Sequence, residues 1–519
     1  MNEIELVLGL MVAVALLGIV AHRLAIPYPI ALVLGGLVIG FIPIHLNVVL
    51  APELVFLLFL PPLLYLSAFN TSARDFRAQA RPILRLAVGL VLATMLGVAV
   101  VVHALLPELG WPLAFALGAI VSPPDAVAAT SIVRQMRVPR HLVTILEGES
   151  MINDATGLVA YRIALAATLT GAFSMFQTAT QFVFVSVTGV AIGLLVGALI
   201  VRVRKKLRDP PVEITISLLT PFAAYLPAEA VGASGVLAAV ACGLLVGRQS
   251  PRIMEAETRL QGRAVWETLI FLLNGLVFVL IGLQLPRIMG ELQARPLGVV
   301  VGLAVLVCVA VVGIRFVWVF LTDLPRLRID RQVWREDVVL SWAGMRGVVS
   351  LAAALALPLS TGSGEPLPER DLLIFVTMCV ILVTLVGQGL TLPALLRWLR
   401  VRGDGSEDVE EAFARETATD AARERIEALA EEWPDHVPLI DTLRTIYQHR
   451  VSHLAERHNE AASSEDAEQE LLEHRAIRHS VIEAERDAIL DLRDTGQISD
   501  DVLRRVEREL DLEELRMEA

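Results

Sequence analysis

The chain has 519 residues, of which 55% are hydrophobic, and its mean hydropathy is +0.62. Soluble globular proteins are about 45 to 50% apolar, so this composition excludes a soluble globular protein and indicates a polytopic membrane protein. The three cysteines lie far apart in apolar runs, which suggests neither a disulfide framework nor a zinc site.

Charge is divided sharply along the chain. Residues 1–402 carry 30 Lys and Arg against 23 Asp and Glu, whereas residues 403–519 carry 14 against 33. We therefore predict a transmembrane domain over 1–402 and an acidic tail over 403–519, with the boundary near Gly403 to Gly405. Periodic Leu, Ile and Val among the charges predict that the tail is helical.

Thirteen apolar stretches are long enough to cross a hydrocarbon core of about 30 Å. They lie at 4–21, 28–44, 50–69, 83–106, 112–132, 142–168, 178–201, 212–228, 232–247, 264–285, 297–321, 335–357 and 371–396. The fold class that we predict is thus an all-α polytopic membrane protein with about 13 transmembrane helices.

Loops rich in Lys and Arg alternate along the chain with loops that have few. One side carries 24 Lys and Arg, whereas the other carries only Arg287, Arg295 and Arg370. The positive-inside rule then places the N-terminus outside and the tail in the cytoplasm of a multi-pass protein of the cell membrane.

Three polar clusters fall at similar depth. Asp154 lies twelve residues into its span, about 18 Å from the start, and the segments 122–125 and 344–347 lie about 15 to 20 Å deep. The prolines in the first segment remove two backbone donors, and the glycines in the second permit unusual backbone. Two interrupted helices crossing near the midplane, in spans of opposite direction, predict inverted repeats around a transport site.

Asp154 is the candidate exchange site. A carboxylate at membrane depth is costly and therefore marks function, and it can hold a proton or a dehydrated monovalent cation but not both. Hard cations prefer oxygen ligands, which carbonyls freed at the Pro123–Pro124 break and the hydroxyls of Ser150 or Ser122 can supply. Because Asn153 is neutral, a single exchangeable carboxylate predicts one cation for one proton with no net charge movement.

Other charges inside the spans need partners. We predict a buried structural ion pair between Glu149 and Arg346, since two lone charges at that depth would each be very costly. Arg162 and Arg315 are also intramembrane, and the sequence leaves their roles open.

Three motifs resemble those of the sodium/proton exchangers of the NhaP and NHE type. They are Ser122–Ala128 (SPPDAVA), which is similar to the family's T-D-P-V-A element, Leu146–Asp154 (LEGESMIND), similar to L-E-G-E-S-x-x-N-D, and Gly344–Gly347 (GMRG), similar to G-x-R-G. The resemblance covers most of residues 1–400. The chain departs from the pattern at Pro124, where Thr is usual, and at Leu66, where many members carry an acidic residue.

The resemblance implies a mechanism and a set of site residues. Asp154 would bind Na⁺ and the proton, with Asn153 as the neutral partner of the electroneutral branch; Ser150 and Asp125 would line the site, a carbonyl near Pro124 would coordinate the ion, and Glu149 would pair with Arg346. It also implies a homodimer in which a six-helix core moves like an elevator against a dimerisation domain. No cofactor beyond the transported ions, no enzymatic activity and no nucleic acid are expected.

Three alternatives to Na⁺(Li⁺)/H⁺ exchange remain open in the sequence. The first is K⁺/H⁺ exchange, which the motifs do not distinguish. The second is an intramembrane aspartyl protease using Asp125 and Asp154, although neither lies in a G-x-G-D element. The third is a cation channel, which would conduct current instead of exchanging ions.

Overall fold

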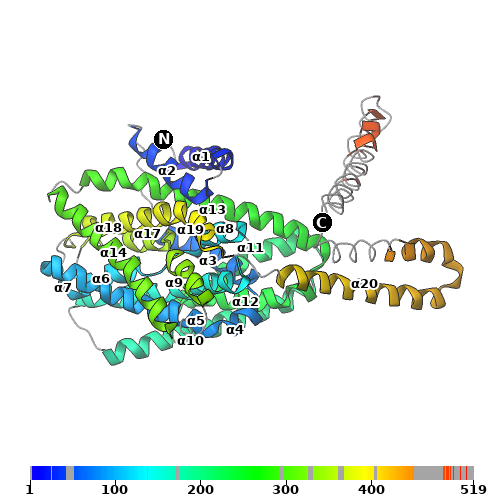
Figure 1. The fold of residues 1–519 in the computed structure, drawn as a ribbon, viewed down its shortest axis with the longest axis horizontal. Coiled ribbons are helices and arrows are strands. Elements are labelled where there is room, and N and C mark those ends of the chain that lie inside the picture. The colour runs from blue at the N-terminus through cyan, green and yellow to red at the C-terminus, as the bar shows by residue number, and fades with distance from the viewer. Residues whose placement is uncertain are drawn as a thin grey trace. The chain divides into compact units, whose positions relative to one another are not determined.

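A computed structural model gives the fold (Figure 1). It describes residues 3–24, 26–42, 52–136, 138–170, 175–291, 296–324, 331–360, 367–401, 406–445 and 447–448, with isolated residues between 483 and 510. The predicted domain boundary at Gly403 to Gly405, and much of the predicted helical tail, lie outside these described residues.

The elements of the described residues are helices. Their bounds are α1 Glu3–Leu24, α2 Tyr28–Phe41, α3 Pro52–Asn70, α4 Ala73–Ala78, α5 Ala80–Leu84, the π-helix η1 Arg85–Leu90, α6 Val91–Leu105, the 3₁₀ turn η2 Pro107–Leu109, α7 Gly110–Val121, α8 Ala126–Gln135, α9 Arg140–Thr170, α10 Met175–Arg204, α11 Pro210–Ala230, α12 Gly235–Ile253, α13 Ala256–Glu291, α14 Leu297–Thr322, α16 Arg331–Trp342, α17 Val348–Leu355, α18 Arg370–Leu382, the π-helix η3 Val383–Gln388, α19 Gly389–Leu399, α20 Ser406–Glu432 and the turn η4 Pro434–His436.

The described residues of each predicted span lie mainly on a helix or on consecutive helices. In the described part of the chain, six helical segments are long and apolar enough to cross a membrane: Ala80–Leu105, Pro107–Arg134, Thr180–Arg204, Ala256–Gln284, Gly298–Thr322 and Arg370–Leu399. Three shorter apolar helices precede them in the chain. The protein is thus a helical membrane protein, and the total of about 13 spans stays a prediction.

The chain divides into two compact units, Met1–Gly403 and Asp404–Ala519. In the first unit, the helices pack mainly within two groups. We call α5 to α9, α14 and α16 to α19 the site bundle, and α1 to α3 with α10 to α13 the scaffold. The main contacts between the groups are those of α13 with α17 and α18, of α3 with α9 and α17, and of α12 with α9.

Glycines set how closely the scaffold helices approach. A Cβ at Gly36 of α2 would overlap the backbone of Val279 in α13, and one at Gly282 of α13 would overlap the backbone of Val33 in α2. Because apolar side chains gain nothing by leaving lipid for another helix, close van der Waals packing at small residues is what joins membrane helices. This reciprocal pair of glycines therefore fixes α2 against α13.

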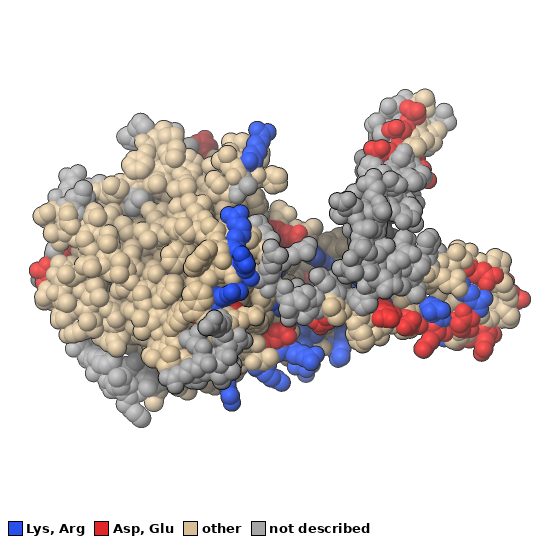
Figure 2. Space-filling view, in the orientation of Figure 1, with Lys and Arg blue, Asp and Glu red and all other residues tan. Residues whose placement is uncertain are grey.

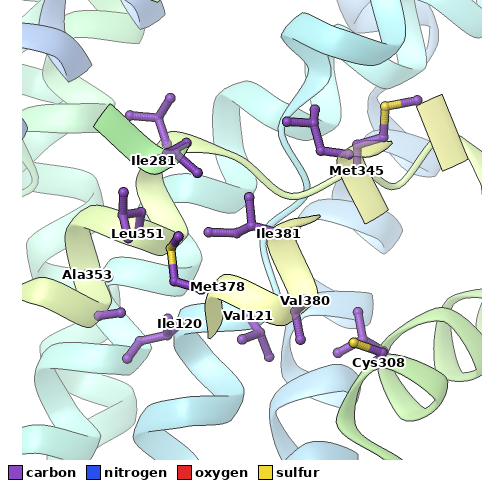
Figure 3. Close-up of a cluster of buried hydrophobic side chains, with 14 of the residues drawn as sticks. Ile120, Val121, Ile281, Cys308, Met345, Leu351, Ala353, Met378, Val380 and Ile381 are labelled. Carbon is purple, nitrogen blue, oxygen red and sulfur yellow. The ribbon is translucent and has the colours of Figure 1, made fainter. Parts of the chain in front are cut away.

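Charged side chains are unevenly distributed over the surface of the first unit. Figure 2 shows a broad uncharged surface on the first unit with Lys and Arg gathered toward one end of it, as basic loops on one side of the membrane would produce. Figure 3 shows part of the buried core between α7, α17, α18 and the segment before α17, with Ile120, Val121, Met345, Leu351 and Ile381 among the labelled side chains. Val121 ends α7, and Met345 lies between α16 and α17, so this packing adjoins the two helix breaks described next.

Candidate functional site

The first helix break separates α7 from α8 at residues 122–125. Pro123 and Pro124 have no N–H to continue the helical hydrogen bonds, so the carbonyls before them lose their usual partners. The Ser122 hydroxyl donates to the Ala119 carbonyl at 3.0 Å, and the Asn153 side-chain amide on α9 donates to the Pro124 carbonyl at 2.8 Å. Asn153 therefore holds the broken segment against α9.

The second break separates α16 from α17 at residues 343–347 and contacts the first directly. The backbone N–H of Asp125 donates to the Met345 carbonyl at 2.7 Å, and the Arg346 N–H donates to the Thr384 hydroxyl at 3.0 Å. The sequence placed two interruptions at similar depth, and the structure brings them into contact.

Asp125 lies between two helix N-termini. Its carboxylate accepts hydrogen bonds from the Val127 N–H at 2.9 Å, in the first turn of α8, and from the Val348 N–H, which begins α17. Gly347 makes room for this arrangement, because a Cβ there would overlap the Asp125 carboxylate. A carboxylate is favoured at a helix N-terminus, which carries partial positive charge and unpaired N–H groups.

Arg346 serves the opposite helix ends. Its Nε donates to the Val121 carbonyl at 3.1 Å, its Nη2 to the Ser122 carbonyl at 3.4 Å, and its Nη1 to the Gly344 carbonyl. The side chain is fully buried. A cation among the carbonyls that end α7 and α16 offsets their partial negative charge, so Asp125 and Arg346 together balance the four helix ends at the two breaks.

Asp154 lies on α9 beside the first break and is only 6% exposed. Within the described residues, no donor forms a hydrogen bond with its carboxylate. The Asp125 carboxylate is near enough for the two negative charges to repel each other. α9 packs tightly on the first break, because a Cβ at Gly157 would overlap the Pro123 ring. One turn before Asp154, the Ser150 hydroxyl accepts the Ala126 N–H at 3.2 Å.

The predicted pairing of Glu149 with Arg346 is wrong. Glu149 forms a two-pronged ion pair with Arg315 of α14, at 2.5 and 2.8 Å, and both side chains are 1% exposed. Arg315 also donates its Nε to the Leu340 carbonyl of α16 at 3.0 Å, and Gly344 leaves room for its guanidinium. The Arg346 guanidinium is instead hydrogen-bonded by backbone carbonyls.

Sequence reasoning identified Arg315 as intramembrane but gave it no role. The available signal was the cost of a buried cation, which demands a carboxylate partner. Arg315 and Arg346 are both buried cations that could pair with Glu149, and the sequence motifs favoured Arg346, which is not the observed partner. Arg162, whose role the sequence also left open, pairs with Glu229 at 2.9 Å, and Glu147 of the LEGESMIND motif pairs with Arg134 at 2.6 Å.

The site thus combines one carboxylate that lacks a hydrogen-bond donor with nearby amide, hydroxyl and carbonyl oxygens. Among the residues that the structure describes, no group of three or more His, Cys, Asp and Glu is placed to hold a metal ion. Oxygen ligands of this kind suit a hard monovalent cation that is carried as a substrate.

Comparison with known proteins agrees with these features. Residues 10–398 match the family described as sodium/hydrogen exchanger, transmembrane. An uncharacterised Na⁺/H⁺ exchanger of Mycobacterium tuberculosis is 37% identical over 99% of this chain and 97% of its own. A sodium, potassium, lithium and rubidium/H⁺ antiporter of Bacillus subtilis is 36% identical over 76% of this chain and 62% of its own.

The fold has a solved counterpart. The sodium proton antiporter MjNhaP1 of Methanocaldococcus jannaschii matches with a TM-score of 0.61 at 21% identity, over 77% of this chain and 99% of that one. The family resemblance predicted from the three motifs is therefore confirmed: the chain belongs to the sodium/hydrogen exchanger family and is a multi-pass cation/proton antiporter.

Proposed function

We propose that the protein exchanges one Na⁺ or Li⁺ for one proton at Asp154, without net charge movement. The observation that carries this proposal is a buried carboxylate with no hydrogen-bond donor among the described residues, beside two broken helices. Leaving such a group charged and alone is costly. A proton or a cation removes that cost, and each excludes the other, so binding of one requires release of the other.

The surrounding charges support a ratio of one to one. Glu149 is neutralised by Arg315, and Asp125 and Arg346 are matched to the N-terminal and C-terminal helix ends. Asn153 adds no charge and is committed to the Pro124 carbonyl through its amide. Asp154 is then the one carboxylate of this cluster whose charge changes during the cycle, so one cation replaces one proton.

The ligand shell that we propose uses the residues nearest the first break. The Pro124 carbonyl and the Ser150 hydroxyl each accept one hydrogen bond and keep a further lone pair for an ion. Asp125 supports the site electrostatically while it holds α8 and α17, and the Ser122 carbonyl, which accepts one hydrogen bond from Arg346, keeps a further lone pair at the break. Pro124, which replaces the usual Thr, supplies its carbonyl but no hydroxyl.

The packing of the helices supports alternating access. Because each helix packs mainly within the site bundle or within the scaffold, relative movement of the two groups disturbs few contacts. We propose that the site bundle moves like an elevator against the scaffold and exposes Asp154 to each side in turn. A homodimer joined through the scaffold, a location in the cell membrane and a cytoplasmic tail complete the proposal.

K⁺/H⁺ exchange is the second candidate. It is favoured by the relative of 36% identity that is named for sodium, potassium, lithium and rubidium exchange. Membership in an exchanger family disfavours the protease and channel alternatives, which would need peptide hydrolysis or a continuous pore.

The decisive test is cation-induced pH change in everted membrane vesicles, with Na⁺, Li⁺ and K⁺ added in turn. Asp154→Asn should abolish exchange because the amide can neither ionise nor balance a cation. Asp209→Asn, at an exposed helix start, is the matched control and should transport normally. Exchange that persists in Asp154→Asn rejects the site, and exchange that responds to an imposed membrane potential rejects the 1:1 ratio.

A further inference from the structure

Arg162 connects the helix that carries Asp154 to the scaffold. Its Nη2 lies 2.9 Å from Oε2 of Glu229, in the last turn of α11. α9 belongs to the site bundle and α11 to the scaffold, and the bond joins residues 67 positions apart in the chain. The sequence left the role of Arg162 open, and neither exchange chemistry nor the helix breaks require it.

Glu229 is the fixed member of this pair. Its Oε1 accepts the N–H of Gly235, the first residue of α12, at 3.1 Å. Gly235 packs so closely on Glu229 and Tyr225 that a Cβ would come within 2.9 Å of the Glu229 Cγ. The scaffold therefore holds the carboxylate in place at a helix N-terminus, where negative charge is stabilised. The Arg162 side chain is more exposed, at 53% against 26% for Glu229.

A small cavity lies beside the pair, between the two helix groups. It has a volume of about 70 Å³, and its walls include Val159 and Tyr161 of α9, Tyr225 of α11 and Val236 of α12. The Tyr161 hydroxyl is buried and has no hydrogen-bond partner among the described residues. At this end a buried apolar cluster that includes Ala155 of α9, Tyr225 of α11 and Val236 of α12 joins the site bundle to the scaffold, and the ion pair adds a polar contact beside the cavity.

The pair lies at the end of the bundle remote from the basic loops. Arg162 is 22 residues beyond Arg140, where α9 begins, which corresponds to about 33 Å of helix, and it is about 12 Å beyond Asp154. With the predicted orientation, this end faces outward.

We propose that Arg162 and Glu229 form a latch that closes the outer end of the ion pathway while the site faces the cytoplasm. The proposal rests on the alternating-access cycle proposed above. A charge-assisted hydrogen bond of this length is lost when its partners separate by more than a fraction of an ångström, so the latch opens once α9 moves against α11. Partly exposed ion pairs are weak, which suits a contact that must break in every cycle.

The experiment measures access to the cavity with a thiol introduced into its wall. Val159→Cys places that thiol on α9, and a membrane-impermeant maleimide is added to right-side-out vesicles. The protein without Val159→Cys gives the background, because Cys242 and Cys308 are buried and Cys379 is half-buried. Adding Arg162→Ala or Glu229→Gln should speed labelling about two- to fivefold, as expected for loss of a weak ion pair.

Two further variants show that the charge is responsible. Arg162→Lys keeps the cation and should leave labelling close to that of Val159→Cys alone. Arg263→Ala removes an exposed ion pair within α13, whose side chains are 80% and 64% exposed, and should change nothing. Equal labelling rates with and without Arg162→Ala and Glu229→Gln overturn the latch.

The labelling result is independent of ion exchange. Exchange that persists in Asp154→Asn, together with faster labelling in Arg162→Ala, would reject the proposed site and leave the latch standing. Loss of exchange in Asp154→Asn with unchanged labelling in both latch variants would do the reverse.

Discussion

Replacing Arg315 with Ala should destabilise the protein more than any other single change at the site. Its guanidinium makes two hydrogen bonds with Glu149 and one with the Leu340 carbonyl, and both charged side chains are 1% exposed. Ala removes all three donors and leaves a buried carboxylate without its counter-charge.

The magnitude follows from that burial. Breaking a buried ion pair by removing one partner costs about 3 to 5 kcal/mol, which corresponds to roughly a hundredfold to several thousandfold in the folding equilibrium. Replacing both partners with Met should recover most of the loss, because no buried charge then remains. The Leu340 carbonyl would still lack the Arg315 Nε, so full recovery is not expected.

The assay heats the detergent-solubilised protein and measures by size-exclusion chromatography how much remains unaggregated at each temperature. Arg315→Ala should lower the midpoint temperature clearly, and the double Met variant should return it most of the way. Arg263→Ala, which removes an exposed ion pair with Glu267, should leave the midpoint unchanged because exposed pairs contribute about 0 to 1 kcal/mol.

A midpoint for Arg315→Ala equal to that of the parent would refute the reasoning, since it would mean that Glu149 is not a buried carboxylate dependent on Arg315. A double Met variant no more stable than Arg315→Ala would show that packing, and not the unpaired charge, sets the cost.

Two further substitutions probe the helix breaks. Gly347→Ala should lower stability by about 1 to 3 kcal/mol and should also lower the exchange rate, because the new Cβ would overlap the Asp125 carboxylate. Gly302→Ala, whose Cβ meets nothing within 4 Å, is the control. Equal exchange rates in the two variants would contradict this packing. Asn153→Asp should lower the stability by about 1 to 3 kcal/mol, because an ionised carboxylate cannot donate to the Pro124 carbonyl and the site already holds the carboxylate of Asp154. An unchanged midpoint temperature in the same heating assay would show that this hydrogen bond is unimportant.

The sequence by itself indicated a helical membrane protein, the two breaks and the family. Apolar length, paired prolines at 123 and 124 and the glycines around Arg346 act on the local backbone, so they can be recognised without knowing what lies nearby. The same holds for Asp154, because a carboxylate in an apolar span is unusual wherever its neighbours are.

Only the tertiary structure decided which charges meet. Whether Glu149 faces Arg315 or Arg346 depends on the rotation of α9 and α14 about their axes and on the path of the break between α16 and α17, which carries Arg346. The rotation of α9 also brings Arg162 to Glu229. The contact between the two breaks places Asp125 against the start of α17 as well as its own helix. Spacing along one helix fixes the relative direction of its own side chains. Which face the neighbouring helix presents to them depends on packing, and that packing is set by contacts between residues far apart in the chain.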